Sequence, residues 1–209
     1  MCAKGTGENA AAGRACAALA GWDRRFEVES RGTALFHWFW LAVERDTGLW
    51  QVPFNPADPV GTPYGIVTEG ARGERLLKAL GEAAMRLEAK GIALDAPWGE
   101  VQRAMMNGAA IPVHGGQHEL GVLNMQRSAE GPDGRLQPVH GTSYIQIVGF
   151  DEKGPVADAI LSYSQSTNPA SPHFADQTPR YAAKEWHRLP FHPEEVRAAA
   201  IAPPKRIAQ

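Results

Sequence analysis

A few cysteine, histidine and serine residues have side chains that could act as a nucleophile, a general base or a metal ligand. Removal of Met1 would make Cys2 an N-terminal thiol, a nucleophile whose own amino group can serve as the base. Residues 3–9, which follow Cys2, are polar and interrupted by glycine, and this composition is unlike that of a strand. We therefore interpret residues 1–10 as a flexible tail and keep an autonomous Cys2 hydrolase as the third of three functional hypotheses.

His114 and His118 are spaced as in some metal-binding motifs. Two histidines four residues apart converge on one metal ion only when they lie on an α-helix. Gly115, Gly116 and the preceding Pro112 disfavour a helix at this point. We predict a loop after a hairpin here and assign no metal site and no cofactor.

Two further pairs could suggest catalysis, Ser143 with His140 and His173 with Asp176. Residues 141–145 lack the second glycine of a nucleophile elbow, and neighbouring residues of a strand point to opposite faces. Asp176 is expected instead to cap the helix that follows it, with His173 fixing the preceding loop by hydrogen bonds. We assign no catalytic residue and no cofactor-binding residue.

An aromatic run, Trp38, Phe39 and Trp40, could line a pocket for an acyl chain, but we favour packing in the core. The run lies in residues 34–43, where apolar side chains cover almost every face of a predicted helix. Each aromatic side chain left in water would cost on the order of 1 kcal/mol or more at about 25 cal/mol per Å². We therefore expect this helix to need neighbours on several sides, and to expose an apolar patch if the chain is alone.

The composition is that of an ordinary globular protein and excludes several functional classes. The 209 residues are 44% hydrophobic, with a formal net charge of -2 and a pI of about 6.4. Basic residues are scattered, which argues against a nucleic-acid or anionic-membrane surface. Residues 34–43 form the most apolar run, and its length is roughly half the 20 residues that a membrane span requires. Cys2 and Cys16 lack the spacing of a metal site, although one disulfide between them is compatible with the sequence.

Hydrophobic periodicity predicts helices in the first and last parts of the chain. Residues 69–90 show the clearest amphipathic pattern, and Gly91 is expected to cap the C-terminus of that helix. Pro193 suits the first position of the last helix. The predicted helices are residues 10–22, a segment after Ser30 that ends at Val43, residues 69–90, 176–187 and 193–201.

Strands are predicted mainly in the second half of the chain. Asn107 and Gly108 form a hairpin turn signal between residues 101–106 and 109–113. The other predicted strands are residues 120–126 and an antiparallel pair, residues 139–150 and 156–163. Residues 48–65 contain four prolines and are expected to form an extended connector without regular structure, anchored by Trp50, Val52 and Phe54. Helices, then strands, then helices indicate an α+β fold.

Four segments in series resemble the later part of the β-chain of penicillin acylases, the family that includes the acyl-homoserine-lactone acylases. The most specific is the polar, proline-containing stretch 163–177, which is similar to a signature near the C-terminus of that chain. The others are residues 16–36, 50–63 and 140–144. Together they cover roughly residues 14–195.

The resemblance implies a fold and an activity for a larger protein. The family has a four-layer αββα sandwich with two antiparallel sheets, and its members are amidases with an N-terminal nucleophile. The nucleophile is a serine at the start of the β-chain, upstream of the region matched here, so no residue of this chain aligns with a catalytic position. No cofactor is needed; some members bind calcium, but no matching acidic cluster occurs here. A periplasmic location is expected from the family.

The first functional hypothesis is that residues 11–209 are the C-terminal segment of such a β-chain, a scaffold inactive by itself. The whole enzyme would hydrolyse the amide between an acyl group and an amine, as in acyl-homoserine lactones or β-lactams. Its partners would be the α-chain and the front of the β-chain, with no nucleic acid and no membrane span. The alternative is a standalone noncatalytic remnant or binding module.

Overall fold

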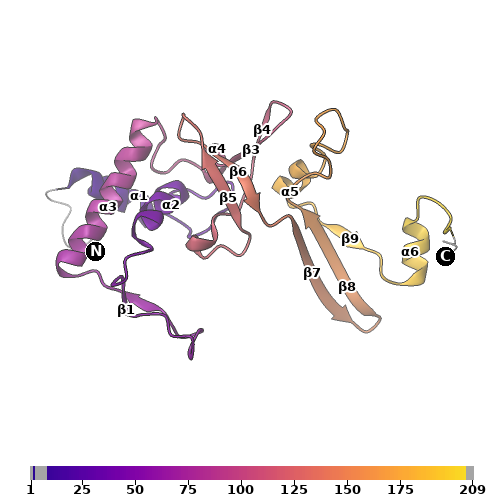
Figure 1. Cartoon of the computed structure of the whole chain (residues 1–209), viewed down its shortest axis with the longest axis horizontal. Helices are drawn as coiled ribbons and strands as arrows, with labels where there is room; N and C mark the ends of the chain where they lie inside the picture. The colour runs from indigo at the N-terminus through magenta and orange to yellow at the C-terminus, as the bar shows by residue number, and fades with distance from the viewer. Residues whose placement is uncertain (1, 3–8, 206–209) are drawn as a thin grey trace. The chain divides into compact units, whose positions relative to one another are not determined.

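The computed structural model describes residues 2 and 9–205, and it divides into two compact units (Figure 1). Unit 1 comprises residues 1–141 and unit 2 comprises residues 142–209. Both units contain helices and antiparallel strands, which confirms the α+β class. In the part of the chain that is described, no helix is both long enough and apolar enough to cross a membrane.

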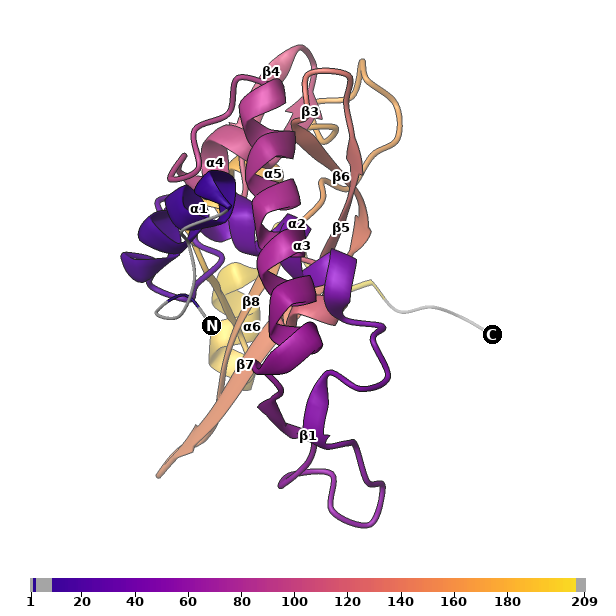
Figure 2. The same ribbon diagram turned by 90° about the vertical axis from the view of Figure 1, so that its left-hand side faces the viewer.

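Unit 1 is built around a long helix, α3 (Gly70–Ala89), against which α1 (Ala10–Ala20) and α2 (Thr33–Val43) pack (Figure 2). Asn9 precedes α1, and its side-chain oxygen accepts a hydrogen bond from the backbone N–H of Ala12 at 3.0 Å. A short helix, α4 (Trp98–Val101), adds a fully buried tryptophan to the same core. The buried core of unit 1 includes Leu35, Phe39, Leu76, Leu80, Leu87 and Trp98.

The C-terminus of α3 confirms the capping role predicted for Gly91. Gly91 has φ +65°, a left-handed conformation that glycine adopts without steric cost. Its N–H donates to the carbonyl of Glu88 at 2.9 Å, and the N–H of Ile92 donates to the carbonyl of Leu87 at 3.0 Å. These two bonds define a Schellman motif, in which Ile92 and Leu87 both join the core.

Helix α2 is enclosed within unit 1, so the expectation that it would expose an apolar patch was wrong. It packs against α1, α3, α4 and the short 3₁₀ helix η2 (His118–Leu120). Phe39 is 8% exposed, Trp38 lies under the guanidinium of Arg86 at 3.8 Å, and the indole of Trp40 donates to the carbonyl of Glu119 at 2.5 Å. The neighbours that the helix requires come from the same chain, and the core interpretation of this aromatic run is confirmed.

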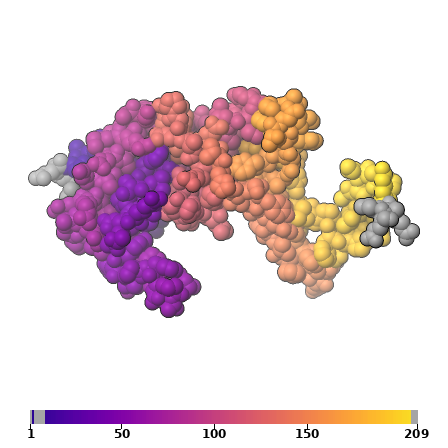
Figure 3. All heavy atoms as spheres, in the orientation of Figure 1, coloured from indigo at the N-terminus to yellow at the C-terminus, as the bar shows by residue number. Residues whose placement is uncertain are grey.

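The connector 48–65 contains regular structure, contrary to the prediction. Strands β1 (Trp50–Val52) and β2 (Tyr64–Ile66) pair antiparallel, because the prolines lie in the loop between them rather than in the paired residues. This hairpin and its loop project from the helices of unit 1 (Figures 2 and 3). Phe54 is 59% exposed and does not anchor the loop.

The remaining strands of unit 1 form two hairpins. Strands β3 (Arg103–Met106) and β4 (Ala109–Pro112) pair through Asn107 and Gly108, whose φ values of +48° and +80° are those of a type I′ turn; the predicted hairpin is confirmed. Strands β5 (Gln126–Glu130) and β6 (Leu136–Gly141) form the other. The predicted strand 120–126 is wrong, since β5 only begins at its last residue.

Unit 2 contains a three-stranded antiparallel sheet in the order β7-β8-β9. Strands β7 (Tyr144–Asp151) and β8 (Gly154–Leu161) form the predicted hairpin, and β9 (His187–Leu189) pairs with the other side of β8. Two helices, α5 (Thr178–Ala183) and α6 (Pro193–Ala199), complete the unit.

Two predicted elements of this region were too long. Residues 139–150 are not one strand: β6 ends at Gly141 in unit 1, and β7 begins at Tyr144 in unit 2. The helix predicted over 176–187 ends at Ala183, because Lys184 takes up a left-handed conformation with φ +56°. The chain then re-enters the sheet as β9.

Candidate functional site

The signature loop 163–177 is a closed hydrogen-bonded structure in unit 2. The hydroxyl oxygen of Ser164 accepts hydrogen bonds from the N–H groups of Gln177 at 3.1 Å and Thr178 at 3.4 Å, at the start of α5. His173 and Asp176 meet through Nδ1 and Oδ2 at 2.8 Å. This bond from His173 holds the pKa of the Asp176 carboxyl below its usual range.

These contacts correct one prediction about the loop and confirm another. Asp176 was expected to cap α5, but Ser164 supplies the oxygen for the first N–H groups of the helix. His173 does fix the loop, since it holds Asp176 through its ring and accepts from the N–H of Ser166 through its carbonyl at 3.1 Å. The pair is exposed to solvent on the histidine side, and its role in the structure is to close the loop.

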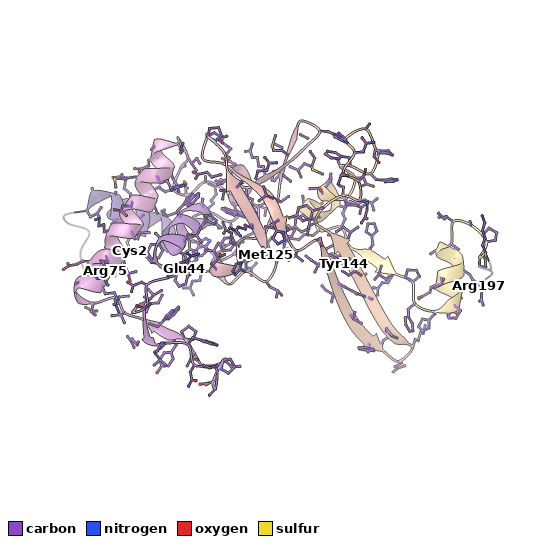
Figure 4. All side chains as sticks on the ribbon, viewed as in Figure 1. Cys2, Glu44, Arg75, Met125, Tyr144 and Arg197 are labelled. Carbon is purple, nitrogen blue, oxygen red and sulfur yellow. A yellow bond between two sulfur atoms is a disulfide. The ribbon has the colours of Figure 1, made fainter. Side chains whose placement is uncertain are left out.

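Cys2 is bonded to Cys16 of α1 in a disulfide, with the two Cα atoms 5.7 Å apart (Figure 4). A nucleophilic cysteine acts as a thiolate, and a sulfur atom in a disulfide cannot do so. The autonomous Cys2 hydrolase is therefore wrong for this structure. Most of the predicted tail lies outside the described residues, but residue 2 itself is tied covalently to α1.

For the other two candidate pairs, the described residues show no catalytic or metal-binding contact. His114 lies in a loop, as predicted, with its Nδ1 atom 3.0 Å from the side-chain nitrogen of Asn124, while His118 begins η2. No group of three or more histidine, cysteine or acidic side chains that could hold a metal ion occurs among the residues described. His140 belongs to β6 of unit 1, whereas Ser143 belongs to unit 2.

A cavity of about 920 Å³ lies in unit 1, between the turn after α1, helix α2 and the loop that leads to β5. Trp22, Phe26 and Phe36 form its aromatic wall, and Arg24 and Arg25 supply positive charge. The sequence reasoning missed this site because its walls are separated by up to about a hundred residues. The pair of adjacent arginines was visible, but nothing local placed it beside an aromatic cluster.

His37 is a buried titratable residue in α2. Its side chain is 1% exposed, and neither ring nitrogen has a hydrogen-bond partner in the described part of the chain. Burial, followed by the charge of Arg86, lowers the pKa of His37 to about 4. The ring is therefore neutral at neutral pH, and it packs against the rings of Trp38 and Trp98 at centroid distances of 4.8 and 5.6 Å.

Comparisons with known proteins agree with the resemblance seen in the sequence. The chain is 39% identical over 201 residues to acyl-homoserine lactone acylase PvdQ of Pseudomonas syringae pv. syringae (strain B728a), covering 95% of this chain and 26% of the relative. It is 33% identical over 198 residues to aculeacin-A acylase of Actinoplanes utahensis, covering 93% of this chain and 24% of the relative. The chain thus spans about a quarter of the length of these curated relatives.

A solved structure, thermostable penicillin G acylase from Alcaligenes faecalis in orthorhombic form, is similar over 85% of this chain and 38% of that chain. The TM-score is 0.36 and the identity is 16%, values too low to support an inference about the site. The sequence evidence is stronger, because the penicillin amidase family model matches residues 3–198. This protein belongs to the penicillin amidase family.

Proposed function

We propose that this chain is the C-terminal segment of the β-chain of a penicillin-acylase-like amidase, and that it contributes scaffold rather than the nucleophile. The complete enzyme hydrolyses the amide bond between an acyl group and an amine. Acyl-homoserine lactones are the preferred substrate class, with β-lactam amides second, because relatives that are 37–39% identical are named as acyl-homoserine lactone acylases. The four-layer sandwich of the family would be completed by the rest of the enzyme.

The observation that carries this proposal is strand β7, which starts at Tyr144 (Figure 4). It pairs with β8 on one side only, so its other edge presents unpaired backbone groups in the described structure. Its side chains are apolar on both faces: Val148 and Phe150 on one face are 48% and 79% exposed, and Ile147 on the other is 59% exposed.

A sheet with two apolar faces and an open edge has no interior of its own to bury them. Full burial of an aliphatic or aromatic side chain stabilises a protein by about 1.5–3 kcal/mol, so covering this strand is worth several kcal/mol. The covering partner we propose is the remainder of the acylase, which corresponds to about three quarters of the length of the relatives. A strand added beside β7 and a layer packed over the sheet would satisfy both the edge and the faces.

We further propose a periplasmic location for the complete enzyme. The Cys2–Cys16 disulfide supports this proposal, since disulfides persist in oxidising compartments. Trapping free thiols in the native polypeptide with a maleimide, before denaturation, tests it: unreacted Cys2 and Cys16 are expected, and full labelling of both would contradict it.

The decisive experiment is the purification of the native polypeptide that carries this sequence, with its intact mass and N-terminus determined and its amidase activity assayed. We expect a chain several hundred residues longer than these 209 residues that begins with serine, copurifies with a second chain and hydrolyses acyl-homoserine lactones. A native chain limited to these 209 residues, with no amidase activity, would refute the proposal and favour a standalone remnant.

The role of β7 is tested by the isolated chain and by the complete enzyme. We expect the isolated chain to bind a hydrophobic dye or to self-associate, and Ile147→Lys with Phe150→Lys to reduce this. Val139→Lys is the matched control, because Val139 is 61% exposed on β6 of unit 1. In the complete enzyme the β7 variant should fail to assemble, whereas equal behaviour of the two variants would contradict a covered β7.

A further inference from the structure

The cavity of unit 1 combines features of a binding site for a small molecule. Its volume of about 920 Å³ lies within the range of about 300–1,000 Å³ that ligand sites in proteins occupy. The rings of Trp22 and Phe36 pack directly against each other with their centroids 4.4 Å apart. The ring of Phe26 meets that of Trp22 edge-on, at a centroid distance of 6.3 Å. This aromatic wall suits an aliphatic chain or an aryl ring.

The charged side chains that line the cavity indicate which polar group a ligand would carry. Arg24 and Arg25 line it, and within the described structure neither guanidinium group has an ion pair or a side-chain hydrogen bond. Glu27 also lines the cavity and has an interaction of its own. Two arginines and one glutamate give the lining a formal net charge of +1. Guanidinium groups bind carboxylates through paired, charge-assisted hydrogen bonds.

The turn that carries both arginines is held in place by its surroundings. The carbonyl of Arg25 accepts hydrogen bonds from the indole of Trp22 at 3.3 Å and from the hydroxyl of Thr33 at 2.9 Å. Arg24 has φ +62°, a conformation that costs a non-glycine residue about 1 kcal/mol or more and persists only where neighbouring contacts impose it. The backbone position of the two arginines is thus fixed before any ligand arrives.

The part of the wall around Gly115 is fixed as firmly. The N–H of Gly115 donates to the carbonyl of Phe26 at 2.9 Å, and the buried indole of Trp98 donates to the carbonyl of Gly115 at 2.9 Å. A side chain at Gly116 would come within 2.6 Å of the Phe26 ring, so this wall approaches the aromatic cluster closely. Binding therefore requires little ordering of the protein backbone, which favours affinity.

We propose that this cavity binds an amphipathic carboxylate, with its alkyl or aryl part against Trp22 and Phe36 and its carboxylate at Arg24 and Arg25. Two sources supply this chemistry, a free alkanoic acid and an arylacetic acid. The proposal does not require amide hydrolysis, so it stands or falls separately from the function proposed above.

The test is photoaffinity labelling of the complete native polypeptide with a medium-chain alkanoic acid that carries a diazirine, followed by mass-spectrometric mapping. We expect labelled peptides from residues 19–36 and 114–124, and competition by unlabelled alkanoic acid or arylacetic acid identifies the preferred source. The corresponding diazirine alcohol serves as the neutral probe, and it should label these peptides about tenfold less, the effect of losing roughly one charge-assisted hydrogen bond.

Matched variants decide whether the arginines hold the carboxylate. The Arg24→Gln/Arg25→Gln variant should reduce labelling by about tenfold or more. Arg127→Gln is the control, because Arg127 is an exposed residue of β5 that does not line the cavity, and it should leave labelling unchanged. Absence of label from these peptides, equal labelling by the alcohol, or equal labelling of the double variant with an unchanged melting temperature would overturn the proposal.

Discussion

Replacing His37 should remove a large part of the acid sensitivity of unit 1. In the folded protein the pKa of His37 is lowered to about 4, first by burial and then by Arg86, whereas an unfolded chain has a histidine pKa of about 6.5. As pH falls through this window, the unfolded chain takes up a proton that the folded chain does not. Folding is therefore favoured fully above pH 6.5, and the stability is lost progressively as pH falls toward 4.

The magnitude follows from the difference between the two pKa values. One pKa unit corresponds to about 1.4 kcal/mol, so a difference of about 2.5 units amounts to a loss of about 3 kcal/mol by pH 4. His37→Leu removes this proton uptake and also the cost of two buried ring nitrogens without partners, roughly 1–3 kcal/mol. We expect the variant to be at least as stable as the wild type at pH 7 and more stable by about 3 kcal/mol further at pH 4.

The assay is urea denaturation at several pH values between 7 and 4, followed by tryptophan fluorescence, because Trp38 and Trp98 contact the His37 ring. The quantity of interest is the difference in unfolding free energy between variant and wild type, in which the titration of all shared groups cancels. His37→Gln is the matched control: it keeps a buried polar group but cannot titrate, so it should lose the pH dependence without gaining stability at pH 7. A difference that stays constant from pH 7 to pH 4 would refute the reasoning.

Three further predictions concern contacts within unit 1 or within unit 2. Cys16→Ser should lower the free energy of unfolding of unit 1 by about 3 kcal/mol, because the disulfide closes a loop with a sequence separation of 14 in the unfolded chain. Equal melting temperatures of the oxidised wild type and the variant would contradict the disulfide. Gly91→Ala should lower the free energy of unfolding by about 1 kcal/mol, because its φ of +65° disfavours a side chain although there is space for one. Gly21→Ala is the control: Gly21 also lies at a helix end but has φ -95°, so its thermal melt should be nearly unchanged. Ser164→Ala should destabilise the start of α5 by about 1 kcal/mol, visible as faster amide exchange at Gln177 and Thr178; unchanged exchange there would argue against the cap.

The sequence by itself determined the features whose cause lies within a few residues. Asn107 and Gly108 predict a type I′ turn because both central residues need a positive φ, and the structure has it. Gly91 ends α3 for the same kind of local reason. The series of segments ending in residues 163–177 was also sufficient to recognise the family, which needs no coordinates.

Only the tertiary structure decided the contacts between residues far apart in the chain. The open edge of β7, the pairing of Cys2 with Cys16 and the cap that Ser164 gives to α5 each depend on which segments meet in space. Helix α2 illustrates the reason. Its apolar pattern predicts burial on several sides but does not indicate which elements cover it; the structure shows that these are α1, α3, α4 and η2. Local propensity fixes backbone conformation, whereas burial, charge pairing and cavities arise from non-local packing, which the pattern of one segment does not encode.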